Sequence, residues 1–564
     1  MARIRRWGAT LAALLLAGCA ASQPPSYDLL IRHGTIVDGS GRAAFTGDVA
    51  VRGDRIAYVG AHAPGTARRT IDAAGKAVAP GFINMLSWAT ESLLIDGRGE
   101  SDLRQGVTLE VMGEGSSMGP LTPTMAKALV AQQEEGLRYP VRWTTLGGYL
   151  DHVAAQGVAP NIASFLGAAT AREMVLGDTA AAPDPAQLRA MQGVVRQAMD
   201  EGAMGVASAL IYPPGAFART PELAALAGTA ARCGGIYATH LRSEGDRFLE
   251  SVDEAIAIGR AADVPVHFYH LKVGGRDNWP KMAAAIARIE AARRSGLRVS
   301  ADVYPYIASG TGLDASMPPW LFDGGMEAGI ARLKNPATRR RVVAEMQGKG
   351  DWENVLRMAG PDKAVIAGVR TAALQPLVGR TLADIARERG VSAEEAAIEL
   401  VVADRGRVDT IYQTMDEDNL RAALAWPFTA IGSDAPAIAA EGAFLNGRAH
   451  PRTYGSFARV LARYARDEKR LSLPEAVRRM SGLPAAILGL ADRGLLRTGY
   501  LADIVLFDPE TIADHASFAD PHRYATGVSD VFVNGIAALA DGKPTGAAPG
   551  RVVRGRGWKA CPAK

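Results

Sequence analysis

The sequence lacks the features of a nucleic-acid-binding protein or a disulfide-based scaffold. Its 564 residues include only three cysteines, and 63 lysines and arginines are nearly balanced by 59 aspartates and glutamates. The resulting net charge of +4 gives no reason to expect a nucleic-acid partner. Nearly half of the residues, 48%, are hydrophobic. A chain of this length and composition can bury a large core and should fold into more than one structural unit.

The chain also lacks a hydrophobic run long enough to span a membrane. The apolar stretch 9–17 follows three arginines and is typical of a signal peptide. It ends in Leu16-Ala-Gly-Cys19, which resembles a bacterial lipobox, where cleavage leaves a lipid-modified Cys19. The alternative is an ordinary signal peptide with a chance cysteine. We predict a signal peptide at 1–19, a tether at 20–26, and a lipid-anchored protein of the bacterial cell envelope that faces the periplasm.

The other two cysteines are Cys233 and Cys561. They could pair in an oxidising periplasm, but Cys561 lies in a tail rich in Gly, Arg and Lys. We therefore expect two free or buried thiols.

Short strand patterns at both ends of the chain flank a long alternation of strands and helices. The end segments, 27–80 and 491–550, predict one composite β-sandwich domain. From 81 to 490, strands alternate with helical stretches, as in parallel β/α units. Eight strands are expected near 82–86, 107–113, 161–167, 205–210, 236–241, 264–271, 299–304 and 428–433. We predict an α/β fold, a (β/α)8 TIM-type barrel. An insertion after the seventh strand, 310–361, is expected to act as a lid or substrate wall.

Three of the expected barrel strands end in side chains that can bind a metal. The fifth ends at His240, the sixth at His270 and the eighth at Asp434. Reactive groups of a barrel collect at the carboxyl ends of its strands, so these groups can converge on one Zn²⁺. The carboxylate can also take a proton from water. Each residue alone has a simpler interpretation, a hydrogen-bonded histidine or a helix N-cap. Because two of only nine histidines end consecutive strands, we favour a metal site.

Several segments together resemble the D-aminoacylase group (N-acyl-D-amino-acid deacylases) of the metal-dependent amidohydrolases. The resemblance extends from residue 27 to residue 545. Its segments are Val78-Ala-Pro-Gly-Phe-Ile83, Arg104-Gln-Gly-Val-Thr108, Tyr237-Ala-Thr-His-Leu-Arg-Ser-Glu244, His270-Leu-Lys272, Tyr304-Pro-Tyr306, Gly432-Ser-Asp434, His450-Pro-Arg-Thr-Tyr-Gly-Ser-Phe457, Ala502-Asp-Ile-Val and Val533-Asn-Gly. The resemblance implies a barrel with a flanking sandwich and a zinc ion bound by His240 and His270. It also implies Asp434 as the general base.

The same resemblance places Lys272, Tyr304, His450 and Arg452 near the substrate. An N-acyl amino acid is an anion, so a cation must meet its carboxylate. Arg452 is a candidate, although it could instead form an ion pair that closes the barrel. Tyr304 could donate to a developing oxyanion or pack under the lid.

The sequence departs from this family at three strands. Leu86 and Trp88 stand where the family has a His-x-His pair on the first strand, and Asn84 replaces an aspartate. Because neither Leu86 nor Trp88 can bind the metal, we expect one zinc ion per chain, with apolar bulk filling the vacant half-site. After the second strand, Gly115 takes the place of a cysteine ligand, and we expect Glu114 to supply the third ligand. Glu114 could instead be a solvated turn residue or an acceptor for a ligating histidine.

At the third strand Gly167-Ala168 replaces the family's Gly-His, which weakens any claim of identical substrate chemistry. The leading prediction is a metal-dependent hydrolase that cleaves the amide bond of a small N-acylated amino acid, most simply an N-acyl-D-amino acid. The alternatives are a dipeptidase, a cyclic-amide or lactone hydrolase, or a non-catalytic envelope binding protein on a degenerate barrel.

Overall fold

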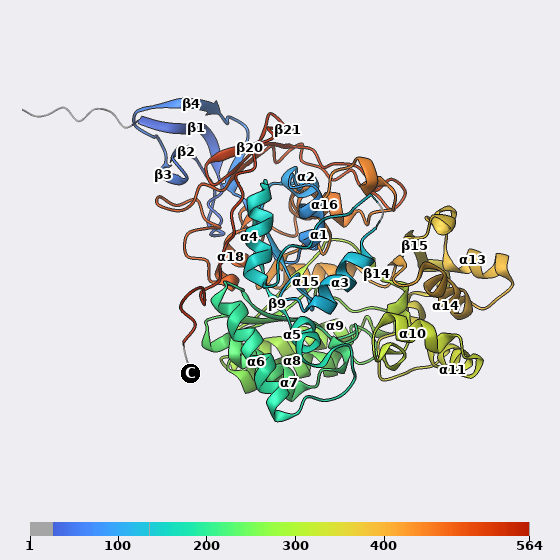
Figure 1. Ribbon diagram of the computed structural model, residues 1–564. Coiled ribbons are helices and arrows are strands. Elements are labelled where there is room, and N and C mark those ends of the chain that lie inside the picture. Colours follow the sequence, from blue (N-terminus) through green and yellow to red (C-terminus); the bar gives the residue numbers. More distant parts are fainter. Residues whose placement is uncertain (1–25, 135, 563–564) are drawn as a thin grey trace, which may run out of the picture.

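A closed barrel of parallel strands forms the centre of the computed structural model, which describes residues 26–134 and 136–562 (Figure 1). The predicted signal peptide, Cys19 and residues 20–25 of the tether lie outside this range. The barrel strands are β6 (Phe82–Asn84), β7 (Val107–Met112), β8 (Asn161–Ser164) continued by β9 (Leu166–Gly167), β10 (Gly205–Ala209), β11 (Ile236–His240), β12 (Val266–Phe268), β13 (Val299–Val303) and β17 (Thr429–Ile431). They pair in the orders β6-β7-β8 and β9-β10-β11-β12-β13-β17. The predicted α/β barrel is confirmed.

Backbone hydrogen bonds join the two sheets into a ring. Met204 N donates to Ser164 O (3.0 Å), which links β8 to the start of β10. On the other side, Asp434 N donates to Leu86 O (2.9 Å) and Trp88 N donates to Ala435 O (3.0 Å). This second seam brings the ends of the first and last barrel strands side by side.

Helices surround the barrel, and the sequence marks where several of them begin. Helix α6 starts at a capping box in which Asp184 accepts from the backbone of Gln187 while the Gln187 side chain accepts from Asp184 N. None of the described helices is both long and apolar enough to cross a bilayer. The helices packed on the barrel are α1 (Ala89–Ile95), α2 (Glu100–Leu103), α3 (Pro123–Gln132), α4 (Leu146–Gln156), α5 (Ala168–Leu176), α6 (Pro185–Asp200), α7 (Thr220–Arg232), α8 (Phe248–Ala262), α9 (Lys281–Arg294), α15 (Glu417–Ala425), α16 (Arg452–Arg459), α17 (Leu473–Met480) and α18 (Gly482–Leu488).

The two ends of the described chain build one β unit, seen at the top of Figure 1 in blue and red. Its strands are β1 (Ser26–Ile36), β2 (Phe45–Arg52), β3 (Arg55–Gly60), β4 (Thr66–Asp72), β5 (Ala77–Pro80), β18 (Ile504–Phe507), β19 (Val528–Val533), β20 (Ile536–Ala540) and β21 (Lys543–Pro544). They form a single sheet in the order β21-β20-β19-β18-β5-β1-β2-β3, with β4 paired to β1. The antiparallel pair β5–β18 joins the N-terminal strands to the C-terminal ones.

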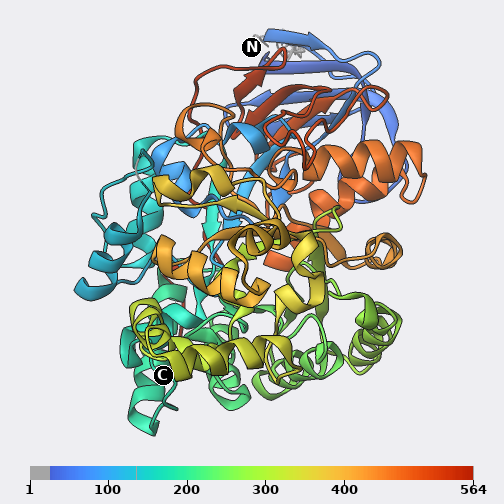
Figure 2. The same cartoon turned by 90° about the vertical axis from the view of Figure 1, so that its right-hand side faces the viewer.

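A second unit follows the seventh barrel strand and projects from the barrel on the side away from the terminal sheet (Figures 1 and 2). Strands β14 (Ser309–Gly312), β15 (Ala364–Gly368) and β16 (Asp409–Tyr412) form an antiparallel sheet. Its helices are α10 (Met326–Leu333), α11 (Pro336–Gln347), α12 (Val355–Ala359), α13 (Leu382–Arg389) and α14 (Ala393–Asp404). The unit has its own apolar core, which runs from Leu313 to Tyr412. The predicted end at residue 361 was therefore wrong, because the chain up to Tyr412 packs into this core. We call residues 309–412 the insertion.

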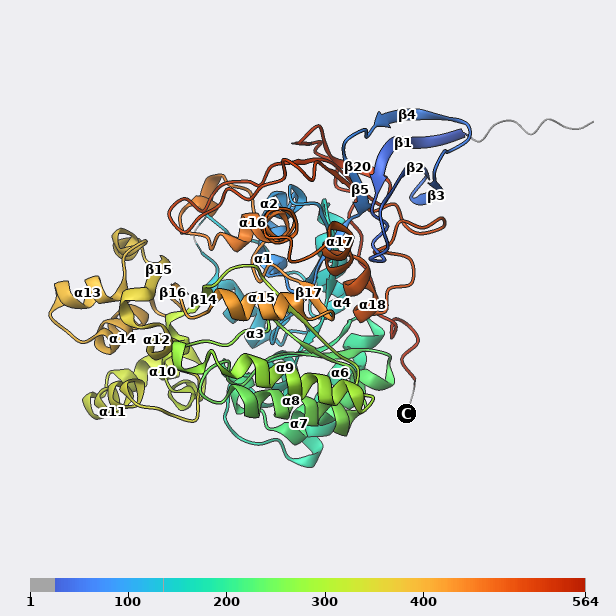
Figure 3. The ribbon, with the colours of Figure 1, turned by 180° about the vertical axis from the view of Figure 1, so that it is seen from behind.

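The C-terminal tail crosses the base of the barrel and ends in a disulfide bond between Cys561 and Cys233, which directly follows α7 (Figure 3). Backbone bonds hold the tail along its length: Val553 N donates to Ile162 O (2.8 Å) and Gly555 N to Gly202 O (2.9 Å). The expectation of two free thiols was wrong, because these bonds bring the tail to α7 and leave the two Cα atoms 4.6 Å apart.

Candidate active site and metal centre

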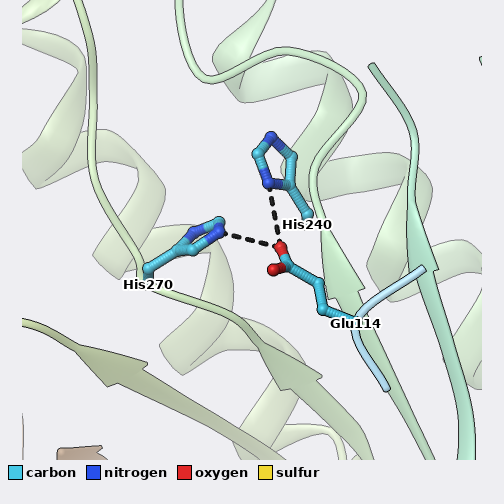
Figure 4. Close-up of side chains that lie close together, drawn as sticks. All are labelled: Glu114, His240 and His270. Atoms are coloured by element: carbon cyan, nitrogen blue, oxygen red, sulfur yellow. Dashed lines mark hydrogen bonds and ion pairs between the residues drawn. The ribbon is translucent and has the colours of Figure 1, made fainter. Parts of the chain in front are cut away.

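Glu114, His240 and His270 meet at the carboxyl ends of three barrel strands (Figure 4). His240 is the last residue of β11, His270 follows β12, and Glu114 lies two residues beyond β7. Glu114 Oε1 lies 3.1 Å from His240 Nδ1 and 3.0 Å from His270 Nε2. All three side chains are buried. The structure thus brings together the three residues predicted as metal ligands.

The donor set fits a zinc ion. Two imidazole nitrogens and a carboxylate oxygen are ligands that Zn²⁺ prefers, with bonds of about 2.0–2.2 Å. Donors at two corners of such a tetrahedron lie about 3.3 Å apart, close to the separations of Glu114 Oε1 from the two ring nitrogens. The ligand atoms of Glu114, His240 and His270 all lie within 4.8 Å of one another. A fourth position facing the cavity would stay open, as in catalytic zinc sites.

Two glycines allow Glu114 to reach the site. Gly113 and Gly115 have φ angles of 99° and 67°, in the left-handed region where other residues are strained. A Cβ atom at Gly115 would lie 2.5 Å from Ala209 Cβ, so a cysteine there would clash unless the neighbouring strand moved. The backbone therefore favours a ligand from Glu114 and disfavours one from position 115.

Charges around the three ligands are strongly coupled. Burial would raise the pKa of Glu114, but the hydrogen bonds from His240 and His270 outweigh it and hold that pKa below its ordinary value. Burial and Lys272 would lower the pKa of His270, yet Glu244 and Glu114 raise it to about 10. A metal ion would compete with the proton on His270, because only an unprotonated ring nitrogen can ligate.

Asp434, the predicted base, is held at both carboxylate oxygens. Trp88 Nε1 donates to Oδ1 (3.0 Å), and Arg452 Nη1 lies 2.7 Å from Oδ2. Burial raises the pKa of Asp434, while Arg452 and His270 oppose this effect. Asp434 and His270 have φ angles of 50° and 33°. Non-glycine residues in this region carry backbone strain, which is common at functional sites.

The prediction for the vacant half-site needs correction in one respect. Leu86 is buried among apolar side chains, as expected. Trp88, however, is more than apolar bulk, because its indole N–H bonds the predicted base. Beneath them, Asn84 Nδ2 donates to Asp102, Glu110 and Ser433 at 2.8–3.2 Å. Burial raises the pKa of Glu110 to about 7, and burial together with Glu110 raises the pKa of Asp102, so Asn84 lies between two carboxyl groups that hold their protons more readily than usual.

The four predicted substrate residues occupy different places. His450 and Arg452 line a cavity of about 1110 Å³ together with the three ligands, Asp434 and Lys272. Lys272 Nζ is paired with Glu244 (2.7 Å). Both ring nitrogens of His450 bond the backbone, at Ala308 O and Arg452 N (3.0 Å each).

Tyr304 lies behind this group. Its ring packs under Arg452, with the guanidinium carbon 4.6 Å from the ring centre. Its hydroxyl points toward Met415 Sδ (3.6 Å), and burial raises its pKa to about 12. This placement matches the packing interpretation of Tyr304 better than a donor aimed into the cavity.

The sequence did not assign a role to three further residues at the site. Trp88 was interpreted only as bulk, Glu244 only as a neighbour of His240, and Glu353 not at all. Glu353 belongs to the insertion, is buried, and accepts a hydrogen bond from the backbone N of Glu244. Burial, with a contribution from Glu244, raises the pKa of Glu353 to about 8. The sequence shows that Glu244 closely follows His240. It gives no sign that Glu353, in the distant insertion, contacts Glu244.

Comparison with known proteins agrees with this arrangement. Residues 69–536 match the amidohydrolase family model. D-aminoacylase of Alcaligenes xylosoxydans xylosoxydans is 36% identical over 538 residues, which cover 94% of this chain and 98% of that protein. N-acyl-D-glutamate deacylase of the same organism is 33% identical and covers 93% and 96%.

Solved structures give the same result in three dimensions. A crystal structure of D-aminoacylase, described as defining a novel subset of amidohydrolases, superimposes with a TM-score of 0.78 at 34% identity, covering 94% of this chain and 100% of that one. N-acyl-D-glutamate deacylase from Bordetella bronchiseptica, in complex with zinc and a phosphonate inhibitor, superimposes with a TM-score of 0.76 at 32% identity and the same coverage.

Proposed function

The chain belongs to the amidohydrolase family, and from that premise we propose that it hydrolyses N-acyl-D-amino acids to a D-amino acid and a carboxylate. The observation that carries the proposal is the convergence of Glu114, His240 and His270 on a cavity that Asp434 and Arg452 also line. Relatives at 33–36% identity are named D-aminoacylase, N-acyl-D-glutamate deacylase and N-acyl-D-aspartate deacylase. This activity fits the predicted hydrolysis of a small N-acylated amino acid.

We propose one zinc ion per chain, held by Glu114, His240 and His270. A bound zinc ion would polarise the substrate carbonyl and lower the pKa of a water molecule to about 7. One D-aminoacylase structure is described in terms of a binuclear metal centre with one-metal activation and second-metal attenuation. Because Leu86 and Trp88 supply no ligand atoms, this chain would keep only a single-metal site.

Asp434 would act as the base. Its carboxylate takes a proton from the attacking water, whose oxygen bonds to the acyl carbon. The C–N bond then breaks, and Asp434 returns the proton to the leaving amine. Trp88 orients this carboxylate through its hydrogen bond to Oδ1.

Arg452 would bind the substrate carboxylate. It is buried, and its Nε has no hydrogen-bond partner among the described residues. An unpaired buried donor next to a cavity is well suited to an anionic ligand. A substrate carboxylate would compete with Asp434 for Arg452 and so free Asp434 Oδ2 to accept a proton. Lys272 also lines the cavity, but its charge is paired with Glu244.

We also propose that the protein is attached to the cell envelope through a lipid on Cys19 and faces the periplasm. The lipobox-like sequence supports this location, and so does the bond between Cys233 and Cys561, since disulfides persist in oxidising compartments. Replacing Cys19 by serine should move the protein from the membrane fraction to the soluble periplasmic fraction. Unchanged fractionation would rule the anchor out.

A substrate panel tests the activity. It should contain N-acetyl-D-amino acids with apolar and acidic side chains, their L-enantiomers, D-containing dipeptides, cyclic amides and lactones. We expect turnover of N-acetyl-D-amino acids by zinc-loaded protein, and loss of that turnover in Asp434→Asn with the zinc content retained. Turnover confined to the other classes, or an Asp434→Asn variant as active as the wild type, would refute the proposal.

A further inference from the structure

One carboxylate lies behind both histidines of the metal centre. Glu244 Oε1 is 3.1 Å from His270 Nδ1, and Glu244 Oε2 is 3.8 Å from His240 Nε2. These are the ring nitrogens that do not face Glu114. His240 Nε2 is fully buried and has no hydrogen-bond partner within the described part of the chain. Glu244 itself is 4% exposed, so water does not replace these contacts.

The chemistry of a ligating histidine explains why a carboxylate is useful where Glu244 lies. A neutral imidazole that binds a cation through one nitrogen carries its proton on the other, and that N–H needs an acceptor. If His240 ligates through Nδ1 and His270 through Nε2, the two N–H groups are Nε2 of His240 and Nδ1 of His270. Glu244 is the carboxylate that both of them face.

Lys272 is the charged partner of Glu244 and also lies next to His270. Its ammonium group lies 2.7 Å from both oxygens of Glu244 and 2.8 Å from His270 Nδ1. An ammonium can only donate a hydrogen bond, so it cannot bond His270 Nδ1 once that nitrogen carries the proton. Glu244 can accept from both groups, because its Oε1 lies 3.1 Å from His270 Nδ1 and both of its oxygens lie 2.7 Å from Lys272 Nζ. Lys272 also supplies the positive charge that Glu244 requires, which argues against a second cation bound by His240, Glu244 and Glu353.

The insertion completes the arrangement. Glu353, in the segment between α11 and α12, accepts from the backbone N of Glu244. Four residues further on, in α12, Arg357 pairs with Asp246. The insertion is therefore bonded to the loop after β11 at Glu244 and Asp246, next to the two histidines.

We propose that Glu244 is the positioning residue of the metal centre, where its single carboxylate orients both ligating histidines and Lys272, and that Glu353 of the insertion holds Glu244 in place. This inference rests on the proposed function, because it requires His240 and His270 to be ligands. In this role Glu244 acts through the two histidines and not as a ligand itself.

Zinc affinity is the direct test, measured by competition with a chromophoric chelator. Glu244→Gln should weaken zinc binding about 10- to 100-fold, the usual cost of losing an outer partner of a ligand. Glu353→Ala removes one backbone hydrogen bond and should weaken it about 2- to 10-fold. Glu222→Gln is the matched control, since Glu222 is similarly buried and bonds Arg172, and neither of these residues lines the cavity. Its zinc affinity should equal that of the wild type.

The outcomes separate this inference from the proposed function. If the wild type binds no zinc, or His240→Ala binds as much as the wild type, the proposed function fails. If the wild type binds one zinc ion through His240 but Glu244→Gln binds it equally well, only the role of Glu244 is overturned. An equal loss of affinity in Glu222→Gln would also overturn it, by pointing to general destabilisation.

A second variant covers poor folding of Glu244→Gln. Glu244→Asp keeps the charge but shortens the reach toward the histidines, and its fold can be checked by thermal unfolding. We expect a changed visible absorption spectrum of bound Co²⁺, because the ligand geometry shifts. A Co²⁺ spectrum and affinity identical to those of the wild type would refute the positioning role.

Discussion

Replacing Trp88 by phenylalanine isolates the hydrogen bond that Trp88 gives to Asp434, the proposed base. Phenylalanine keeps an aromatic ring in the same place but has no N–H to bond Asp434 Oδ1, which now accepts at 3.0 Å. Among the described residues, the carboxylate would then keep Arg452 as its close partner, at Oδ2. The residues that would hold the metal are not changed by this substitution.

The size of the effect follows from the kind of bond that is lost. A hydrogen bond to a charged group contributes about 1.5–3 kcal/mol. Since each 1.4 kcal/mol is a factor of ten in rate, we expect kcat to fall about 10- to 100-fold, with KM changed little. Burial already raises the pKa of Asp434, and loss of a donor that stabilises its anion raises that pKa further. The acidic limb of the pH–rate profile should therefore move to higher pH.

The assay is a pH profile of kcat and kcat/KM on the best N-acyl-D-amino acid, with zinc content measured in parallel. Trp320→Phe is a suitable control, because Trp320 Nε1 also donates to a carboxylate, that of Glu345 (2.8 Å), but within the insertion. An unchanged kcat and an unmoved acidic limb in Trp88→Phe would show that Trp88 only fills space. A loss of zinc would show that its effect is on metal binding instead.

Three further predictions concern stability. Burial raises the pKa of Glu110 to about 7, above its ordinary value, so the fold loses stability as the pH rises through that range. The unfolding temperature of Glu110→Gln should therefore rise relative to that of the wild type between pH 5 and pH 8, and a constant difference would contradict this. Cys561→Ser should destabilise the fold by about 2–5 kcal/mol in denaturant titrations, and a reductant should then have no further effect. Zinc at 100 times its dissociation constant should stabilise the fold by about 2.7 kcal/mol relative to protein from which a chelator has removed the zinc. The unfolding temperature of the wild type should therefore fall when the chelator is added, and that of His240→Ala should not depend on zinc.

The parts of the site that follow regular strands could be predicted from the sequence. His240, His270 and Asp434 end or follow apolar strands, and the barrel itself dictates that such positions converge. Glu114 could be proposed because glycines on both sides allow an unusual backbone turn. These residues could be inferred because each needs only a local sequence pattern and the known convergence of strand ends in a barrel.

Other parts depend on contacts between segments with no local signal. The bond from Trp88 to Asp434 exists because the first and last strands meet at the barrel seam, 346 residues apart in sequence. Glu353 reaches Glu244 from an insertion with its own core, and the end of that core at Tyr412 carries no turn or composition mark. The tail that bonds Cys561 to Cys233 has no strand pattern, because it is held by irregular backbone bonds.

The contact between Trp88 and Asp434 also bears on how this site could evolve. A return to two histidines at positions 86 and 88 would remove the indole that now supports the base. It would also place a polar ring at Leu86, which is 1% exposed within an apolar cluster. Either substitution alone would therefore carry a structural cost before a second metal could bind. Under the proposed single-metal site, the contact between Trp88 and Asp434 is thus an obstacle to acquiring the histidine pair.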